Sequence, residues 1–426
     1  MWEKFSGFYR LPVYQRVEKL REELHLDRAD LNLLRGFPGL PVELADRMVE
    51  NVVGVYGQPL GVALYFRVNG RDHVVPMAVE ESSVVAAASK AAKIALASGG
   101  FQAVAPRPVT IGQVQVVECP DVEAASAKVR EKQAKLLAVA NDCQPLLVEL
   151  GGGAFSLRTR RVDGRRGTSL LVELLVDVRD AMGANTVNTM LETVAPEIEA
   201  LTGGRVVLRI LSNLAVERVA TARATFAKHL VGGEQAVENF LWAVDLAEHD
   251  PFRAATHNKG IMNGIVAVAQ ATGNDTRALE AGAHAFAAHG RAYHPLTSYD
   301  VDGDGNLVGR IELPLTVGTV GGITGIHPQA RLALKVLGVK SSAELCEVLA
   351  SVGLAQNFAA LLALSTEGIQ RGHMKLHAAN LALAAGAPRE VVDDVVRLMV
   401  KRGETTLEGA RRALNDLLGG GGGVGP

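Results

Sequence analysis

Two segments of the sequence place a group that can donate a proton or stabilise negative charge among small and polar neighbours. Glu81 follows an expected strand and precedes an expected helix over 84–97, so its carboxyl can project from the junction as a general acid. Lys259 lies within 253–264, a run rich in Asn, Gly and apolar residues, where a partly desolvated ammonium could stabilise an oxyanion. Each also has a structural alternative, because Glu81 could favour a helix N-terminus and Lys259 could lie in a surface turn.

A second carboxylate and a histidine extend this set. Asp275 ends the run Ala-Thr-Gly-Asn-Asp, and its carboxylate could pair with Lys259 and tune its pKa. The alternative is that Asp275 is the N-cap of an expected helix over 276–288. His373 has an unperturbed pKa near ~6.5, so it could protonate a thiolate at physiological pH. A lone histidine is nevertheless more commonly structural or solvated.

The sequence lacks the usual glycine-rich nucleotide motifs, since no GxGxxG follows a strand and no GxxxxGK[ST] occurs. In their place, Asp-Ala-Met-Gly-Ala-Asn at 180–185 opens an expected helix over 183–201. Small residues let a phosphate approach the free backbone amides at that helix terminus, where the helix dipole favours an anion. Asn188 adds a side-chain donor. The alternative is that Asp180 is a plain N-cap with a closely packed glycine beside it.

The elements around this helix predict an inserted unit. Their order, β-α-β-β-α-β over 109–212, is that of a ferredoxin-like domain. The expected strands are 111–117, 155–162, 169–178 and 205–211, and the expected helices are 122–140 and 183–201.

The flanking segments predict an α+β chain with two further parts. Residues 1–108 and 213–369 are expected to form a large, mostly helical substrate domain, with a hairpin turning at Asn69-Gly70. From 212 to 340 the pattern favours helices interrupted by Gly- and Asn-rich loops, followed by separate helices at 342–353 and 358–364. Residues 370–426 are expected to form a C-terminal helical flap that ends in a disordered Gly-rich tail.

Composition narrows the function classes. The chain has 426 residues, which favours two or three domains, and a net charge of −2 with no basic stripe, which argues against a nucleic-acid partner. The three cysteines show no metal-ligand spacing, so we expect no metal site and a reduced, cytoplasmic setting. The N-terminus has no signal-peptide pattern, and lysines break the apolar stretch 84–97, so we expect no membrane association.

Taken together, the segments 50–54, 81–89, 180–188, 253–264 and 367–373 resemble hydroxymethylglutaryl-CoA reductases in order and approximate separation. The runs 180–188 and 256–264 are highly specific to that family, and the likeness extends from about Leu40 to about Asn380. The lack of an expected membrane anchor and the helical tail after His373 resemble class II of the family.

The resemblance implies interconversion of 3-hydroxy-3-methylglutaryl-CoA and mevalonate plus CoA, by two hydride transfers from NAD(P)H in the mevalonate pathway. Glu81 then corresponds to the proton donor to the developing alcohol, and Lys259 to the lysine that stabilises the oxyanion. Asp275 corresponds to the aspartate between them, and His373 to the flap histidine that protonates the departing CoA thiolate.

The resemblance also implies binding residues. The positions that correspond to substrate contacts are Glu50 on the CoA side and Ser83, Arg253 and Asn263 on the hydroxymethylglutaryl side. The positions that correspond to the dinucleotide side are Gln144, Asp180, Ala181, Met182, Gly183, Ala184, Asn185, Asn188, Asn213 and Gln356.

Two departures from the family pattern bear on this assignment. Ser82 stands where many members have Pro. Gln144 stands near the place where NAD-preferring members have an Asp for the adenosine ribose, and Asp142 lies two positions earlier. Because 139–147 contains an acid and no Arg or Lys, we expect NADH to be modestly favoured, with NADPH possible and discrimination weak.

The resemblance to the family also implies a homodimer with the active site between subunits, and a higher oligomer is possible. Two alternative functions stay open at this point: another CoA-thioester oxidoreductase on the same scaffold, and a non-catalytic CoA- or nucleotide-binding protein. The set Glu81, Lys259, Asp275 and His373 argues against the second, since binding alone needs neither a proton donor nor a thiolate acid.

Overall fold

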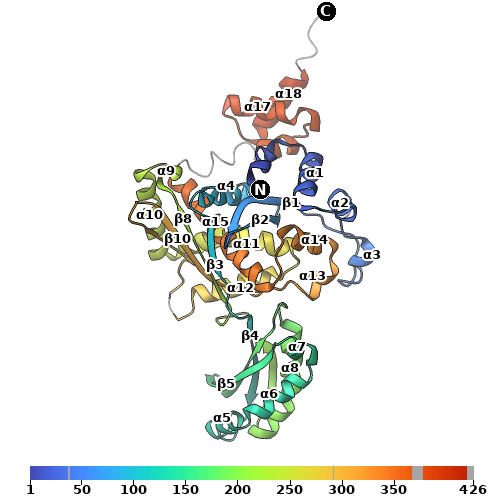
Figure 1. Ribbon diagram of the computed structural model, residues 1–426, viewed down its shortest axis with the longest axis vertical. Helices are drawn as coiled ribbons and strands as arrows, with labels where there is room; N and C mark the ends of the chain where they lie inside the picture. Colours follow the sequence, from blue (N-terminus) through green and yellow to red (C-terminus); the bar gives the residue numbers. More distant parts are fainter. Residues whose placement is uncertain (37–38, 291, 367–377, 420–426) are drawn as a thin grey trace, which may run out of the picture.

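The structure is a computed structural model that describes residues 1–36, 39–290, 292–366 and 378–419. Its elements form a large central part, a smaller sheet-containing part at one end, and a pair of C-terminal helices at the other end (Figure 1). The described chain is therefore divided into three parts, and two of them contain a sheet.

The large part contains a sheet that the sequence only partly predicted. Its strand order is β2-β1-β3-β8-β10-β9, and the first hairpin turns at Asn69 and Gly70, which have φ of 50° and 80° as the sequence predicts. The prediction of a mostly helical domain did not include β3, β8 and β9, and the large part is a six-stranded sheet covered by helices. The strands are β1 (Leu60–Val68), β2 (Arg71–Ala78), β3 (Phe101–Val104), β8 (Val219–Phe226), β9 (Thr297–Val301) and β10 (Leu307–Pro314).

The central helix of the large part is α15 (Ser342–Ser365), a single helix of 24 residues. The sequence predicted a break after Gly353, and this is wrong. Gly353 lies in the core, where an added Cβ would stand 2.8 Å from Ile265 and 3.0 Å from Ile311. The glycine therefore allows close packing of α15 and does not end it. α15 is long and apolar enough to cross a membrane, but 72% of its most apolar window is buried within the protein.

A second long helix, α11 (Pro251–Ala271), packs beside α15 and also corrects a prediction. The segment 253–264, expected as an Asn- and Gly-rich loop, is helical throughout. Asn258 is fully buried, accepts a hydrogen bond from Leu296 N at 3.0 Å and donates one to His294 O at 2.9 Å. Its side chain is thus engaged with another segment and does not compete for its own helix backbone.

Shorter helices complete the large part and cover the sheet. They are α1 (Val13–Leu24), α2 (Arg28–Arg35), α3 (Val42–Ala45), α4 (Val84–Leu96), α9 (Lys228–Val231), α10 (Glu234–His249), α12 (Thr276–Ala287), α13 (Gly322–Ile326) and α14 (Pro328–Leu337), with 3-10 turns at Trp2–Phe5 and Phe8–Arg10.

The small part is a four-stranded antiparallel sheet with strand order β5-β6-β4-β7. Helices α5, α6 and α8 pack on it, and the helix predicted over 122–140 is interrupted at Lys132. Its elements are β4 (Val109–Val117), α5 (Val122–Glu131), α6 (Gln133–Asp142), α7 (Pro145–Glu149), β5 (Gly153–Gly164), β6 (Gly167–Asp177), α8 (Ala184–Thr202) and β7 (Arg205–Leu211).

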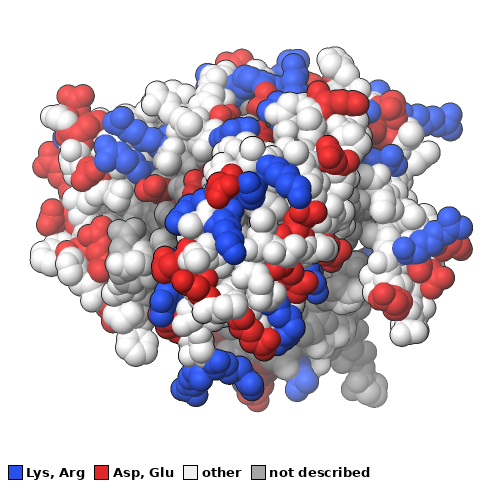
Figure 2. All heavy atoms as spheres, turned by 90° about the horizontal axis from the view of Figure 1, so that it is seen from below, with Lys and Arg blue, Asp and Glu red and all other residues white. Residues whose placement is uncertain are grey.

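Specific contacts join the small part to the large one. Asp180 Oδ1 accepts a hydrogen bond from Ser342 N at 2.8 Å, at the first turn of α15, and Ala181 forms a parallel bridge with Val320. Seen from the end that carries the small part, acidic and basic side chains are interspersed and no large patch of one sign appears (Figure 2).

The C-terminal described helices form a separate packing unit. It contains a 3-10 turn at Arg389–Val391, α17 (Val392–Arg402) and α18 (Leu407–Gly419). Val395, Met399 and Leu414 belong to its own apolar cluster, distinct from the large core. It lies at the opposite end of the molecule from the small part (Figure 1).

Candidate functional site

The structure brings Glu81 and Lys259 together from distant parts of the sequence. Lys259 Nζ lies 3.1 Å from Glu81 Oε2, and the two side chains are 61% and 46% exposed. Glu81 projects from the junction between β2 and α4, and Lys259 from the middle of α11. A carboxyl and an ammonium at this separation can both reach one oxygen of a bound carbonyl compound.

The neighbouring glutamate has a different role. Gln58 Nε2 donates to Glu80 Oε2 at 2.6 Å, so Glu80 is held by the segment that precedes β1 while Glu81 faces Lys259. Ser83 follows with φ of 75°, an unfavourable conformation for a residue with a side chain. This left-handed turn sets the direction in which α4 leaves the strand. Glu81 therefore pairs with Lys259 and does more than favour the N-terminus of α4.

A buried polar network lies behind Lys259, and sequence analysis missed it. His257 is 2% exposed and its Nε2 lies 2.6 Å from Thr297 Oγ1, which donates to Asn357 Oδ1 at 2.9 Å. Burial lowers the pKa of His257 to about 3, with the charge of Arg253 contributing, so the ring is neutral at physiological pH. The network fixes the rotation of α11 that directs Lys259 outward. Its signal in the sequence was the His257-Asn258 pair immediately before the lysine.

The expected substrate-side residues occupy different surroundings. Asn263 lies one turn after Lys259 on α11 and is half-buried. Arg253 begins the same helix, and burial lowers the pKa of its guanidinium. Glu50 is exposed in the turn that precedes 52–59, a segment without regular secondary structure. These residues are thus available to a ligand, but the described contacts do not join Glu50 to the Glu81–Lys259 pair.

Asp275 does not meet Lys259 within one chain. Its Oδ1 accepts from Arg277 N at 3.0 Å and Ala278 N at 3.1 Å, so it is the N-cap of α12. From Lys259, α11 runs on to Ala271, a further distance of about 18 Å along the helix axis. The capping alternative therefore describes Asp275 in the single chain.

The start of α8 supplies the expected anion site. Gly183 has φ of 102°, and an added Cβ would stand 2.6 Å from Val178 Cγ1, so the tight turn requires glycine. No side chain caps this 19-residue helix, which leaves its first amides available to a phosphate. Asp180 is not the N-cap, as the alternative had it, because its carboxylate binds Ser342 N. Asn185 is exposed at this end.

Of the other residues expected on the dinucleotide side, some make contacts within the fold and one has an unsatisfied polar atom. Asn188 Oδ1 accepts from Leu211 N at 3.0 Å, which ties α8 to the end of β7. Asn213 is exposed, while its backbone packs against Gly282 of α12. Gln356 is 5% exposed on α15, and its Oε1 is buried without a hydrogen-bond partner. That oxygen is therefore an acceptor that a ligand amide could satisfy.

Gln144 precedes the short helix α7 and makes no side-chain capping bond. Its half-buried side chain lies next to exposed Asp142, and Leu146 in α7 is 67% exposed. The small part therefore presents an open loop at the position expected for the adenosine ribose.

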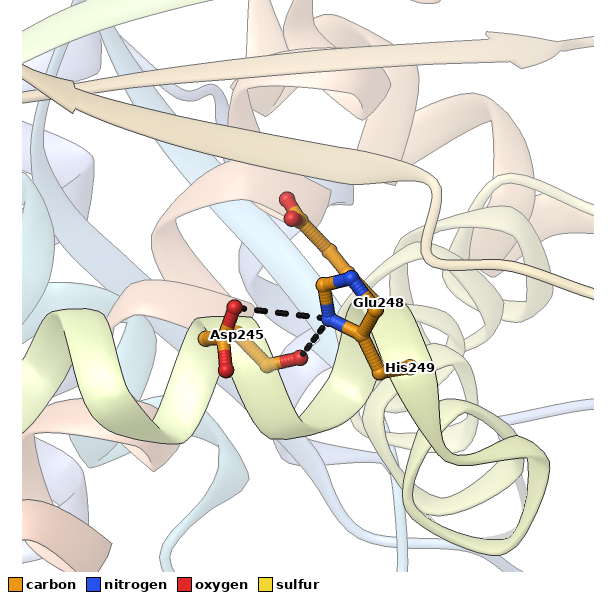
Figure 3. Close-up of side chains that lie close together, drawn as sticks. All are labelled: Asp245, Glu248 and His249. Atoms are coloured by element: carbon orange, nitrogen blue, oxygen red, sulfur yellow. Dashed lines mark hydrogen bonds and ion pairs between the residues drawn. The ribbon is translucent and has the colours of Figure 1, made fainter.

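The fourth expected catalytic residue, His373, lies outside the described residues. Within the described part of the chain, one group has the spacing of metal ligands: Asp245, Glu248 and His249 at the end of α10 (Figure 3). All three are exposed, and His249 Nδ1 lies 2.8 Å from Asp245 O and 3.3 Å from Asp245 Oδ1. The hydrogen bond and the Asp245 charge raise the pKa of His249, which favours the protonated ring of an ordinary ion pair.

Comparisons with known proteins agree with these features. A family model described as hydroxymethylglutaryl-coenzyme A reductase matches residues 12–378. The 3-hydroxy-3-methylglutaryl-coenzyme A reductase of Archaeoglobus fulgidus is 52% identical over 417 residues, which cover 98% of this chain and 95% of the relative. A probable reductase of the same name from Borreliella burgdorferi is 40% identical and covers 88% of this chain and 86% of the relative.

Solved structures give the same result. A 3-hydroxy-3-methylglutaryl-coenzyme A reductase from Streptococcus pneumoniae superposes with a TM-score of 0.83 at 40% identity, over 97% of this chain and 99% of the other. A structure of the class II enzyme from the same organism, bound to NADPH in open conformations, superposes with a TM-score of 0.82 over 85% of this chain and 100% of the other.

Proposed function

The chain is a member of the hydroxymethylglutaryl-coenzyme A reductase family, and from this we propose that it is a class II reductase that interconverts 3-hydroxy-3-methylglutaryl-CoA and mevalonate plus CoA in the mevalonate pathway. The observation that carries the proposal is the 3.1 Å contact between Lys259 Nζ and Glu81 Oε2. It places an ammonium that can stabilise an oxyanion beside a carboxyl that can donate a proton.

In this mechanism two reduced nicotinamide dinucleotides, bound one after the other, would each supply one hydride, and the oxidised cofactor would leave between the two transfers. Lys259 stabilises the oxygen of the thioester carbonyl as it gains charge, and the resulting hemithioacetal collapses to mevaldehyde and CoA thiolate. His373 protonates the thiolate, a role that rests on the family resemblance alone. Glu81 then donates the proton that completes reduction of mevaldehyde to the alcohol. The neutral network beneath α11 keeps Lys259 directed at that oxygen.

We propose that the dinucleotide binds mainly to the small part, with one contact from α15 of the large part. The uncapped amides after Gly183 fit a pyrophosphate, and the unpartnered Oε1 of Gln356 fits the nicotinamide amide. We propose that 109–212 is a ferredoxin-like unit for this purpose, between large-domain segments 1–108 and 213–369 and a C-terminal flap over 370–426. We expect use of both cofactors, with NADH modestly favoured.

We further propose a homodimer with each active site between subunits. Two observations support it. Within the described chain, Asp275 caps α12 and pairs with Arg277 while Lys259 pairs with Glu81, so a single chain shows no Lys259–Asp275 ion pair. Large apolar side chains also stand fully exposed, including Val53 at 103%, Tyr56 at 94% and Phe252 at 84%, which favours an interface. A cytoplasmic location agrees with the burial of α15 in the core.

The reaction is tested with purified protein, 3-hydroxy-3-methylglutaryl-CoA and each reduced cofactor, followed by nicotinamide absorbance and free-thiol release. Oxidation of cofactor with thiol release supports the proposal. Turnover of other acyl-CoA thioesters in preference to this one would favour a different CoA-thioester oxidoreductase. Ligand binding without turnover would favour a non-catalytic protein.

The shared site is tested separately by mixing two inactive variants, Lys259→Ala and Asp275→Asn. If the two residues act from different subunits, mixed dimers contain one intact site, and activity returns to about a quarter of the wild-type value after subunit exchange. Absence of recovery, with exchange shown by differently tagged subunits, would place both residues in the same subunit's site.

A further inference from the structure

Arg179, immediately before the Asp180–Asn185 motif, is held in an unusual backbone conformation. Its φ is 53°, in the left-handed region that residues with side chains rarely adopt. Its amide donates to Asp177 Oδ1 at 2.9 Å, and its carbonyl accepts from Ser342 Oγ at 2.9 Å. The backbone is therefore fixed from both sides, and the fixed turn determines where the side chain points.

The stem of Arg179 and the helix that follows Gln144 meet at Gly152. A Cβ added to Gly152 would stand 2.8 Å from Arg179 Cγ and 2.6 Å from Leu147 Cδ1. Leu147 belongs to α7, the short helix that Gln144 begins, and Gly152 N donates to Leu147 O at 2.9 Å. The Arg179 stem and Leu147 of α7 therefore both border Gly152, close to the loop expected at the adenosine ribose.

The ion pair with Asp177 leaves most of the Arg179 guanidinium donors available to a ligand. Asp177 is buried and is held by Arg107 Nε at 2.6 Å, whereas Arg179 Nη1 lies 3.7 Å from it. The Arg179 side chain stays 49% exposed. A guanidinium with a fixed stem and open donors is suited to a phosphate, which it can bind through two parallel hydrogen bonds.

The cations nearest to Gln144 in sequence are otherwise engaged. Lys135 Nζ lies 2.6 Å from Glu197, and Lys132 Nζ lies 2.9 Å from Glu131. The segment 139–147 has no cation of its own. The half-exposed Arg179, by contrast, borders Gly152, which Leu147 of α7 also borders.

We propose that Arg179 binds the 2′-phosphate of NADPH and thereby determines how well this enzyme uses NADPH in addition to NADH. The inference rests on the proposed dinucleotide site of the small part. The pyrophosphate is assigned to the amides after Gly183, so the ribose phosphate is the anion left for a cation beside Gln144.

The test compares binding of 2′,5′-ADP and 5′-AMP by calorimetry to the full-length protein, since these probes differ only in the 2′-phosphate. Arg179→Gln should weaken 2′,5′-ADP binding by roughly tenfold or more, because a charge-assisted hydrogen bond is lost, and leave 5′-AMP within about twofold. Arg179→Lys keeps the charge and should lose less. The control is Lys135→Gln, which removes a cation of the same domain that Glu197 already holds.

Kinetics give a second readout. Arg179→Gln should lower kcat/KM for NADPH by roughly the same factor and leave kcat/KM for NADH nearly unchanged. Turnover with NADH in every variant would show that the proposed reductase reaction occurs. A failure of the proposed function is therefore distinguishable from a failure of the Arg179 proposal. The proposal is wrong if wild-type protein binds the two probes equally, or if Arg179→Gln weakens both equally or neither.

Discussion

Replacement of Lys259 by alanine should separate catalysis from folding, because the lysine is exposed where it acts. Its ion pair with Glu81 is 61% and 46% exposed, so its loss leaves a carboxylate that water can solvate. Exposed pairs of this kind contribute about 0–1 kcal/mol to stability. Loss of an oxyanion donor costs about a hundredfold or more in rate, or about 2.7 kcal/mol of transition-state stabilisation. The predicted effect on rate therefore exceeds the effect on stability by severalfold.

The small domain provides a matched control for this prediction. Lys135 and Glu197 form an ion pair whose side chains are 61% and 39% exposed, close to the values for Lys259 and Glu81. Lys135→Ala should show the same small change in thermal unfolding and no change in turnover. Both variants are assayed for acyl-CoA reduction under saturating cofactor, together with their unfolding midpoints. Turnover of Lys259→Ala within about threefold of wild type, or an equal loss in Lys135→Ala, would refute the assignment.

Three further predictions concern other residues of the site. His373→Gln should slow the reaction from the acyl-CoA much more than reduction of added mevaldehyde, since only the former expels CoA; equal losses on both would contradict the proton-donor role. Gln144→Asp should raise the preference for NADH over NADPH, measured as the ratio of kcat/KM values, by adding a hydroxyl acceptor and a like charge; an unchanged ratio would place the ribose elsewhere. Because burial lowers the pKa of His257 from 6.5 to about 3, the unfolded chain takes up this proton first as pH falls. The free energy of unfolding is therefore unaffected by His257 above pH ~6.5. It decreases as the pH falls from there toward the folded pKa, and the loss is about 3 kcal/mol at pH 4. His257→Gln should reduce this loss in denaturant unfolding, and a wild-type pH slope in the variant would show that His257 is not its source.

Local patterns predicted the parts of the fold that depend on neighbouring residues. The Asn69-Gly70 pair adopts positive φ at both positions, so the hairpin followed from turn chemistry alone. In the small domain, each strand from β4 to β7 overlaps its predicted range within a few residues, because alternating apolar residues were bounded by clear turns. Lys132, where α5 gives way to α6, carries no breaker residue and could not be identified as a boundary.

Glycine and alanine account for two of the errors in the large domain, because their effect depends on what packs against them. Gly353 favours a helix end from sequence alone, but in the fold it lets α15 pack closely against Ile265 and Ile311. β8 alternates Ala220, Ala222 and Ala224 on its buried face, and alanines at a sheet position carry a weak strand signal. In both cases the tertiary contact overrides the local preference of the residue.

The site followed from sequence only as far as single residues could indicate chemistry. Glu81 and Lys259 were recognised from their neighbours, yet their 3.1 Å contact joins positions that no local pattern relates. Asp275 shows the converse, because its nearness to Lys259 in sequence suggests a pair, whereas in the single chain its carboxylate caps α12. Arg179 lies 35 residues after Gln144, and only the fold brings its stem to Gly152, which Leu147 of α7 also borders. The contact between Glu81 and Lys259 and the packing around Gly152 both join segments that are far apart in the sequence. The chemistry of this site therefore depends on tertiary contacts that composition and spacing do not encode.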